Sequence, residues 1–249
     1  MEWELFYPDM LVELGSYTFQ QGIEIEVYSS SDSYFDWAKV RFTDRFREKI
    51  AVSRRDEASI QLGYHEEFVS VFGGYVVSPY SGGEQNEVVL KDDMLLLEDT
   101  IITNTFLDAT PQEILSFCLN KAGIKESKIS TKIYPKKAVV PIHRKNVIAV
   151  IEAIYSLWKI KEPFFFADGV FYWGKQPEQA RVYAFEYAEN IISLQRRDGL
   201  WELETVSAPF IRHSNLIRVD HPLIAGEFAV KKTVFRTNDN GFIRTTISF

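Results

Sequence analysis

The chain has 249 residues, of which 46% are hydrophobic and 25% are charged, and this balance excludes a disordered or low-complexity protein. The formal net charge is −7, which argues against a dedicated nucleic-acid binder because such a protein presents a basic face to phosphate. A single cysteine excludes an intrachain disulfide framework and a cysteine zinc cluster.

The first third of the chain predicts curved β-strands. Apolar and polar residues alternate, as in strands with one buried face, over residues 22–28, 37–42 and 87–90. From Ala58 to Tyr80 the same alternation predicts two strands that meet in a tight reversal. Gly63 and the pair Gly73-Gly74 interrupt these strands, which indicates bulges, bends or close backbone approach. Strands of this kind suit a small closed barrel.

The middle of the chain changes to a helical period. Thr110-Pro111-Gln112-Glu113 is a strong helix start, because it combines an N-cap threonine, a proline at the first helical position and a glutamate three residues after the cap. The apolar stripe that follows ends at Gly123, the expected left-handed C-cap. A second helix is predicted for residues 145–159, and an Asp-Gly pair at residues 168–169 predicts a hairpin turn.

From residue 182 onward the pattern is again that of strands, and it faintly repeats the order of elements between Ile60 and Leu90. The sequence therefore predicts an α+β, mainly β fold with two β-barrel-like domains and a small α/β insert between them. The expected boundaries are residues 1–90 for the first barrel, 91–180 for the insert with two helices and a hairpin, and 181–249 for the strands that complete the second barrel.

Residues near the C-terminus include the types found in a hydrolytic triad, namely His213, Ser214, Asp220 and His221. A serine nucleophile needs a strained elbow or an adjacent base held at hydrogen-bond distance, and Ser214 has no G-x-S-x-G context. We therefore interpret these residues as a polar strand end and predict no catalytic residue.

A metal site at His65, Glu66 and Glu67 is disfavoured for a geometric reason. Neighbouring strand residues point to opposite faces, so these three side chains converge only if the strand bulges. His143 is distant in the sequence and falls in a stretch read as a Pro- and Lys-rich loop. A solvated hairpin end is the favoured interpretation, and no metal ligand is predicted.

The remaining reactive residue types have structural interpretations. Asp92-Asp93 is interpreted as a cap for a short helix at residues 94–97, and Cys118 as a buried structural thiol on an apolar stripe. No cofactor site is predicted, since the glycine-rich stretch near residue 82 lacks the lysine and helix of a phosphate-binding loop. A basic cluster is interpreted as a solvated loop or a docking surface for an acidic partner, and comprises Lys132, Lys136, Lys137, Arg144 and Lys145.

Taken in order, these segments resemble the baseplate hub proteins of contractile phage tails, the late control gene D family, which is related to the hub part of type VI secretion spike proteins. The order and spacing of several loose motifs carry this resemblance over nearly the whole chain. The motifs are the hairpin at 60–76, the region 92–124 with its capped helix, the helix and Asp-Gly hairpin at 146–172, and the strands at 190–194 and 226–234.

The resemblance implies a structural protein without enzymatic activity or cofactor. In this family three subunits, each with two barrel-like domains, form a ring that joins a hexameric tail tube to a central spike. The implied partners are further copies of the chain in a homotrimer, the tail tube protein, a separate spike protein and other baseplate proteins. The spike is expected to be a separate protein because the chain ends at Phe249 with no appended spike domain.

The resemblance also implies a location in the virion tail baseplate, assembled in the cytoplasm of the bacterial host. An acidic lumen would repel phosphate, so DNA is expected as a partner only in transit. No membrane insertion is expected, because no apolar run approaches a transmembrane length. The acidic start of the chain also lacks the features of a signal peptide.

Two alternative functions stay open, a tail-associated cell-wall hydrolase and a carbohydrate-binding tail module. The first needs a convergent acidic or Cys/His cleft, and the second needs aromatic residues exposed on one platform. In a hub the important residues are interfacial, since a ring must cover its strand edges. The candidate subunit or tube interface comprises Phe68, Val69, Val71, Phe72, Tyr75, Phe228, Val230, Val234 and Phe235, with Tyr17, Trp37 and Trp201 equally open.

Overall fold

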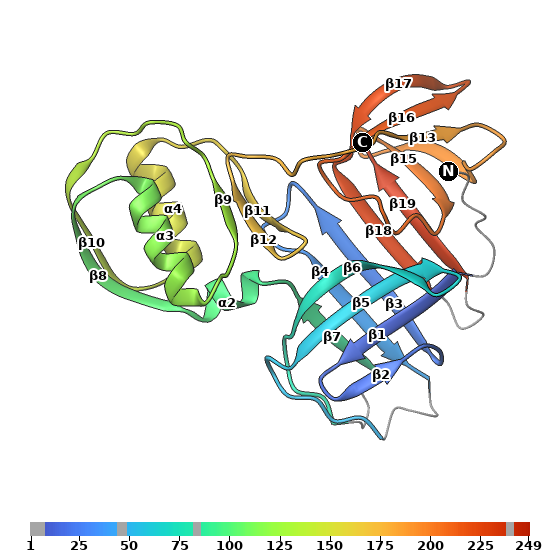
Figure 1. The fold of residues 1–249 in the computed structure, drawn as a ribbon, viewed down its shortest axis with the longest axis horizontal. Coiled ribbons are helices and arrows are strands. Elements are labelled where there is room, and N and C mark those ends of the chain that lie inside the picture. The colour runs from blue at the N-terminus through green and yellow to red at the C-terminus, as the bar shows by residue number, and fades with distance from the viewer. Residues whose placement is uncertain (1–7, 44–48, 82–85, 238–241) are drawn as a thin grey trace. The chain divides into compact units, whose positions relative to one another are not determined.

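The computed structural model describes residues 8–43, 49–81, 86–237 and 242–249. Contacts within the chain group it into two units, one formed by residues 1–92 with 177–249 and the other by residues 93–176. Strands dominate the first unit, whereas the second combines helices with short sheets (Figure 1). The predicted α+β, mainly β fold class is confirmed. The three-part division at residues 90 and 180 stays a prediction.

An antiparallel sheet of eleven strands forms most of the first unit and joins the two ends of the chain. The β18 strand near the C-terminus pairs with β3 near the N-terminus, with Val234 opposite Tyr28. In spatial order the strands are β14 (Ser193–Arg197), β15 (Leu200–Val206), β19 (Ile243–Ser248), β18 (Lys232–Thr237), β3 (Ile23–Ser30), β4 (Trp37–Phe42), β7 (Glu87–Lys91), β6 (Glu67–Val76), β5 (Glu57–Tyr64), β1 (Pro8–Leu14) and β2 (Tyr17–Phe19).

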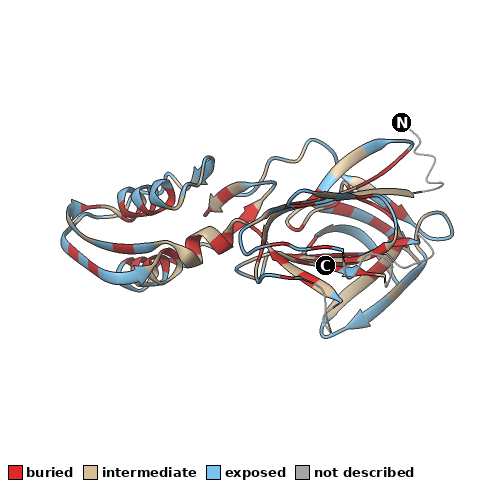
Figure 2. Cartoon of the chain, turned by 90° about the horizontal axis from the view of Figure 1, so that it is seen from below, coloured by how far each residue is buried: buried red, intermediate tan, exposed pale blue. Residues whose placement is uncertain are grey.

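The larger hydrophobic core lies against the N-terminal strands of this sheet, which curl around it (Figure 1). Along β3, Ile23, Ile25 and Val27 are buried and alternate with half-buried glutamates and a tyrosine, because successive strand residues point to opposite faces. The C-terminal strands contribute Phe235 and Ile243 to the same core. Figure 2 shows this alternation of buried and more exposed residues along the strands.

A second core lies beneath a three-stranded sheet in the order β13 (Tyr183–Glu186), β16 (Leu216–His221) and β17 (Ile224–Ala229). Its inward residues include Phe185, Ile217 and Val219, which pack with Leu203 of β15 and Ile247 of β19. The C-terminal strands of the large sheet therefore serve two cores, one through β18 and β19 and the other through β15 and β19.

Glycine permits close backbone approach in the predicted hairpin of β5 and β6. A Cβ atom on Gly63 would overlap the carbonyl oxygen of Glu67, and one on Gly74 would overlap that of Lys91. The reversal itself is a two-residue turn at residues 65–66, both with positive φ. The interpretation as sites of close approach is confirmed for Gly63 and Gly74, whereas a Cβ atom on Gly73 would meet no atom within 4 Å.

The second unit contains α2 (Met94–Asp99), β8 (Ile101–Ala109), α3 (Pro111–Ala122), β9 (Ser127–Ile129), β10 (Lys137–Asn146), α4 (Val147–Trp158), β11 (Phe164–Ala167) and β12 (Val170–Trp173). The β8 and β10 strands form an antiparallel two-stranded ribbon. The β11–β12 hairpin is joined by β9 in a three-stranded sheet. The predicted loop around His143 is wrong, because residues 137–146 pair with β8 as a strand.

The predicted start of α3 is confirmed as a reciprocal capping box. The Thr110 hydroxyl accepts a hydrogen bond from the Glu113 backbone N–H at 3.3 Å, and the Glu113 carboxylate accepts one from the Thr110 N–H at 2.7 Å. Gly123 ends the helix with φ of 82°. Asp93 occupies the predicted N-cap position of α2, but its side chain makes no capping hydrogen bond, and the Asp92 carboxylate accepts from the Asp36 N–H.

We expect Thr110→Ala to destabilise the second unit by about 1 kcal/mol, because the N3 amide of α3 loses its acceptor. Thr110→Ser keeps the hydroxyl and is the matched control. Urea unfolding followed by circular dichroism measures the difference. Equal midpoints for the alanine and serine variants would show that the capping box does not contribute to stability.

Candidate functional site

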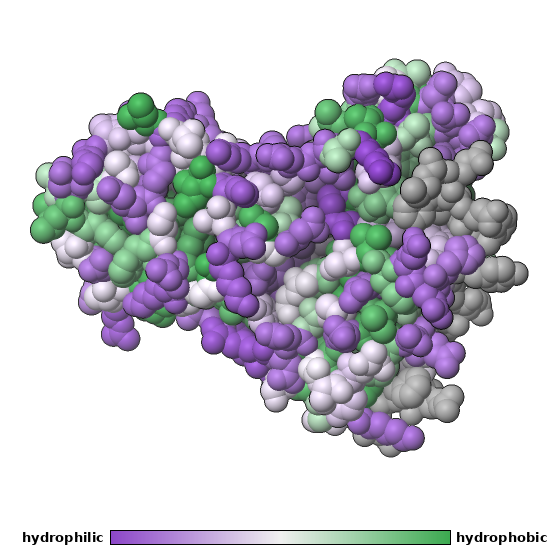
Figure 3. Space-filling view, viewed as in Figure 1, coloured by the Kyte–Doolittle hydropathy of each residue, from purple (hydrophilic) through white to green (hydrophobic). Residues whose placement is uncertain are grey.

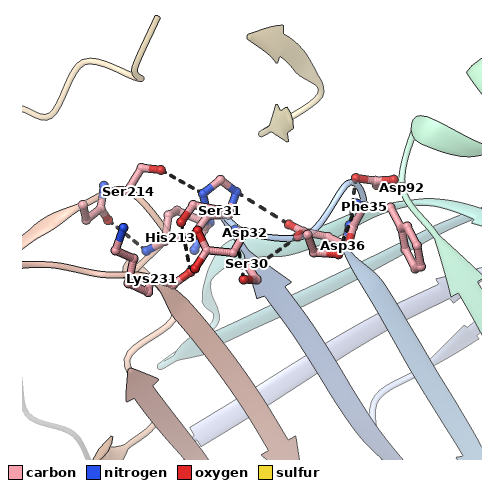
Figure 4. Close-up of polar contacts among 12 residues, drawn as sticks. Ser30, Ser31, Asp32, Phe35, Asp36, Asp92, His213, Ser214 and Lys231 are labelled. Atoms are coloured by element: carbon pink, nitrogen blue, oxygen red, sulfur yellow. Dashed lines mark hydrogen bonds and ion pairs between the residues drawn. The ribbon is translucent and has the colours of Figure 1, made fainter. Parts of the chain in front are cut away.

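A polar junction lies at one end of the β3–β18 pairing and includes two of the predicted reactive residues, His213 and Ser214 (Figure 4). The Asp36 carboxylate accepts a hydrogen bond from the Ser30 backbone N–H at 3.0 Å. The Asp36 N–H in turn donates to the Asp92 carboxylate at 3.0 Å, and the Asp92 N–H donates to the Asp36 carbonyl at 3.1 Å. These bonds fix the loop between β3 and β4 against the end of β7.

His213 connects this loop to the C-terminal strands. Its imidazole is only 2% exposed, and its Nε2 lies 3.9 Å from the Asp36 carboxylate. Its Nδ1 lies 3.0 Å from the Ser214 hydroxyl. Beside it, the Ser31 N–H donates to the Lys231 carbonyl at 3.0 Å. The network therefore holds three segments distant in the sequence together, at residues 30–36, 92 and 213–231.

The junction resembles a hydrolytic triad only in its residue types. Ser214 directly follows His213 in the sequence, and its N–H is used to bond the Val230 carbonyl at 2.7 Å. A buried polar group without a hydrogen-bond partner costs free energy. The need to pair the backbone groups and the imidazole therefore explains these contacts. We assign the network a structural role, which agrees with the interpretation of His213 and Ser214 as a polar strand end.

Asp220 and His221 do not join this network. Both lie on β16, where Asp220 is exposed and the His221 ring packs edge-on against Tyr187 at 4.8 Å. The His221 Nδ1 accepts a hydrogen bond from the Leu223 N–H at 3.1 Å. The four residues that supplied the triad types therefore do not converge. Asp36, which does approach His213, was missed because no sequence signal relates a β3–β4 loop to a segment 177 residues later.

The predicted metal-ligating residue types do not converge in the part of the chain that the structure describes. Among the residues it describes, no group of three His, Cys, Asp or Glu side chains is placed to hold an ion. His65 and Glu66 form the exposed turn between β5 and β6, and the Glu66 N–H donates to the Asp9 carboxylate at 3.2 Å. Asp9, Gln20 and Phe68 are among the residues that line a depression of about 380 Å³ beside this turn.

Cys118 is a fully buried thiol on α3, as the apolar stripe predicts. Burial raises the pKa of the thiol to about 12, because a thiolate is poorly solvated there. The group is therefore protonated at neutral pH and unreactive as a nucleophile.

The basic cluster of residues 132–145 separates into paired and unpaired cations. Lys132 donates to the Glu162 carboxylate at 2.6 Å, and the Tyr134 hydroxyl donates to the same carboxylate at 3.1 Å. The lysine hydrogen bond is the main cause that lowers the pKa of Glu162 to about 2. Lys136 lies 3.6 Å from Asp108. Two of the five cations are therefore engaged in ion pairs within the chain.

The predicted interface residues divide by burial. Four side chains are half-buried and therefore partly accessible on the surface: Phe68, Val69, Tyr75 and Phe228. Five are buried within the chain's own interior: Val71, Phe72, Val230, Val234 and Phe235. Trp37 is half-buried and stacks on Tyr28 at 5.2 Å, and Tyr17 and Trp201 are also half-buried. Contact of any of these with another subunit stays a prediction.

Solved structures of similar fold come from phage tails and a type VI secretion system. No protein-family model and no curated protein matches the chain. The 43 kDa tail protein of prophage MuSo2 from Shewanella oneidensis has a TM-score of 0.72 at 10% identity, with 97% of each chain covered. The tail protein from Neisseria meningitidis MC58 has a TM-score of 0.66 at 11% identity, covering 98% of this chain and 96% of that one.

The E. coli c3393 protein extends the likeness to secretion. It is described as a component of the type VI secretion system with structural similarity to T4 bacteriophage tail proteins gp27 and gp5. Its TM-score is 0.66 at 12% identity, covering 95% of this chain and 75% of that one. The chain thus has a fold found in phage tail proteins, and membership of the late control gene D family stays a prediction. Among the described residues, no helix has the length and apolar character needed to cross a membrane.

Removal of the Asp36 side chain tests the polar junction. We expect Asp36→Ala to lower the free energy of unfolding of the first unit by about 1–3 kcal/mol, because the Ser30 amide loses its acceptor and His213 its neighbouring carboxylate. Asp36→Asn keeps an acceptor oxygen without the charge and should lose less. Chemical unfolding at neutral pH compares the three proteins, and an alanine variant as stable as the wild type would contradict the role of the junction.

The Glu162 ion pair predicts an acid-sensitive contact in the second unit. Because the folded-state pKa lies near 2 and the ordinary value is 4.5, the stabilisation is complete above pH 4.5 and is lost as pH falls through the folded value. We therefore expect Glu162→Gln to be less stable than wild type at neutral pH, with the difference shrinking as the pH falls toward 2. Thermal unfolding across this range measures it, and a pH-independent difference would rule out the ionic origin.

Proposed function

We propose that this protein is a structural component of a phage tail or phage-like baseplate, and specifically a ring-forming hub between the tail tube and the central spike. The observation that carries the proposal is the shared fold with the prophage MuSo2 tail protein, which extends over 97% of both chains. Because the match covers nearly all of both chains, the two share their full arrangement of elements and not only a common fragment. The c3393 protein, with its described likeness to gp27 and gp5, supports the hub position in particular.

The architecture of the first unit supports a ring. Two cores share one continuous sheet through the β3–β18 pairing, so two β bodies are held by backbone hydrogen bonds. Within the described sheets of the first unit, four strands pair on one side only, namely β14 and β2 in the large sheet and β13 and β17 in the small one. Open edges invite pairing with another chain, and a closed ring of subunits is one arrangement that covers them.

The charge distribution supports a lumen that DNA crosses without binding. The residues of the first unit include 26 Asp and Glu against 17 Lys and Arg, whereas residues 93–176 include nine against eleven. An acidic wall repels phosphate, so DNA would be a partner in transit only. The homotrimer, the tail tube, a separate spike and other baseplate proteins are the proposed partners, in a virion assembled in the host cytoplasm.

The reactive residues of the sequence support a role without catalysis. His213 and Ser214 are used in the polar junction, Asp220 and His221 lie elsewhere on β16, and Cys118 is buried and protonated. A cell-wall hydrolase or a carbohydrate-binding module would need a convergent cleft or an aromatic platform. Neither is favoured by an observation on the described residues.

The solution mass of the purified chain tests this proposal. We expect light scattering after size exclusion to give a three-subunit species over a concentration series, alone or with the spike protein of the same particle, and co-sedimentation with tail tubes. Phe68→Ala should weaken association by removing a half-buried candidate, while Tyr34→Ala, at an exposed site outside the candidate set, should not. A monomer under all these conditions that also cleaves cell wall would overturn the hub and favour the hydrolase.

A further inference from the structure

The β8–β10 ribbon has one covered face and one bare face. Its inward residues Ile102, Val140 and Ile142 are at most 5% exposed and lie toward the helices of the second unit. Its outward residues are all exposed and include no Asp, Glu, Lys or Arg: Ile101, Thr103, Thr105, Leu107, Val139, Pro141 and His143. Leu107 and Val139 are directly opposite in the register and are 70% and 58% exposed.

An uncharged, partly apolar strand face of this kind is unusual on a free surface. Exposed ribbons are normally protected by charged side chains, and contiguous exposed apolar residues mark sites of interaction. In Figure 3 hydrophobic side chains reach the surface along the edge that β8 and β10 form in Figure 1. The outward face therefore has the character of a docking surface.

Unpaired cations flank this face. Lys137 lies at one end of β10, and Arg144 and Lys145 lie near the other. Within the described part of the chain none of these three makes an ion pair, in contrast to Lys132 and Lys136. The ribbon thus presents an apolar centre with basic ends, which fits a partner with small or apolar residues and free carboxylates.

The outward face of the β13–β16–β17 sheet has those properties. Its exposed apolar residues are Ala184, Leu216, Ala225 and Ala229. Glu186 and Asp220 are also exposed, and they are register partners on neighbouring strands. Adjacent like charges on neighbouring strands disfavour the sheet, and no described residue pairs with either carboxylate. Arg218, on the same face, does not neutralise these two carboxylates, because it pairs with Glu227 at 2.7 Å.

We propose that the outward face of the β8–β10 ribbon in one copy of this chain docks on the outward face of the β13–β16–β17 sheet in a second copy. Apolar residues meet apolar residues, and the free cations of the ribbon approach Glu186 and Asp220. The two faces are different patches, so the contact is head-to-tail and repeats until a ring closes. The inference rests on the proposed ring and names the surfaces that build it.

Cysteine cross-linking tests the pairing of the two faces in the full chain. One variant carries Thr105→Cys at the centre of the ribbon, and another carries Ala184→Cys on the sheet. A short bis-maleimide is the probe, and the native Cys118 stays silent because it is buried and protonated. We expect a mixture of the two variants to form cross-linked dimers, while either variant alone forms few. The matched control uses Ile133→Cys in place of Thr105→Cys, because Ile133 is 95% exposed and lies outside the ribbon face.

Charge reversal provides a second readout. Asp220→Lys in the Ala184→Cys chain should slow cross-linking by about tenfold, since like charges then face the ribbon, and added salt should narrow the difference. Cross-linking of the Thr105→Cys mixture no faster than the Ile133→Cys control would overturn the inference. So would dimers formed by Thr105→Cys alone, which indicate a symmetric contact, or a bis-maleimide cross-link within one chain of the Thr105→Cys/Ala184→Cys double variant.

The result separates this inference from the proposed function. A chain that forms a three-subunit species but does not cross-link as expected retains the ring and places its contacts elsewhere. Because the cross-link captures brief encounters, a positive result stands even where the purified protein is mainly monomeric.

Discussion

The antiparallel pairing of β3 with β18 is the contact on which the rest of the first unit depends. It turns the N-terminal and C-terminal strands into one sheet of eleven, and it lets Phe235 and Ile243 complete a core formed mostly by residues before position 92. Without this ladder the two cores would no longer share a continuous sheet. The polar junction at its end and the bond from the Tyr64 hydroxyl to the Ser207 carbonyl, at 2.8 Å, hold the same two regions in place.

The buried polar groups illustrate how reactive residue types serve a scaffold. A serine, a histidine and an aspartate lie in contact, yet each is engaged with backbone or with one another, and the neighbouring chain segments depend on those bonds. Burial also raises the pKa of the Tyr64 hydroxyl and of the Cys118 thiol, so both stay neutral. Groups held in one protonation state and one hydrogen-bonding arrangement stabilise a rigid body.

Local signals in the sequence predicted most of the helices and turns, but not the contacts between distant segments. The capping box at Thr110, the glycine at 123 and the Asp-Gly turn encode short-range geometry, and all three are found in the structure. The strand at residues 137–146 was missed because proline and lysine suggested a loop, whereas pairing with β8 decides its state. Asp36 could not be related to His213, nor Glu186 to Asp220, since those neighbours arise only from long-range strand register.

The chain order of β3 and β18 has a consequence for synthesis. Some two hundred residues separate them, and the whole second unit is translated in between. During that interval the edge of β3 has no partner from its own molecule, while residues 93–176 can already fold through local contacts. In that interval the open edge of β3 can pair with the β18 strand of a neighbouring chain that is nearer completion, which would tie the two molecules together. Correct maturation depends on each chain closing its own sheet before it meets another.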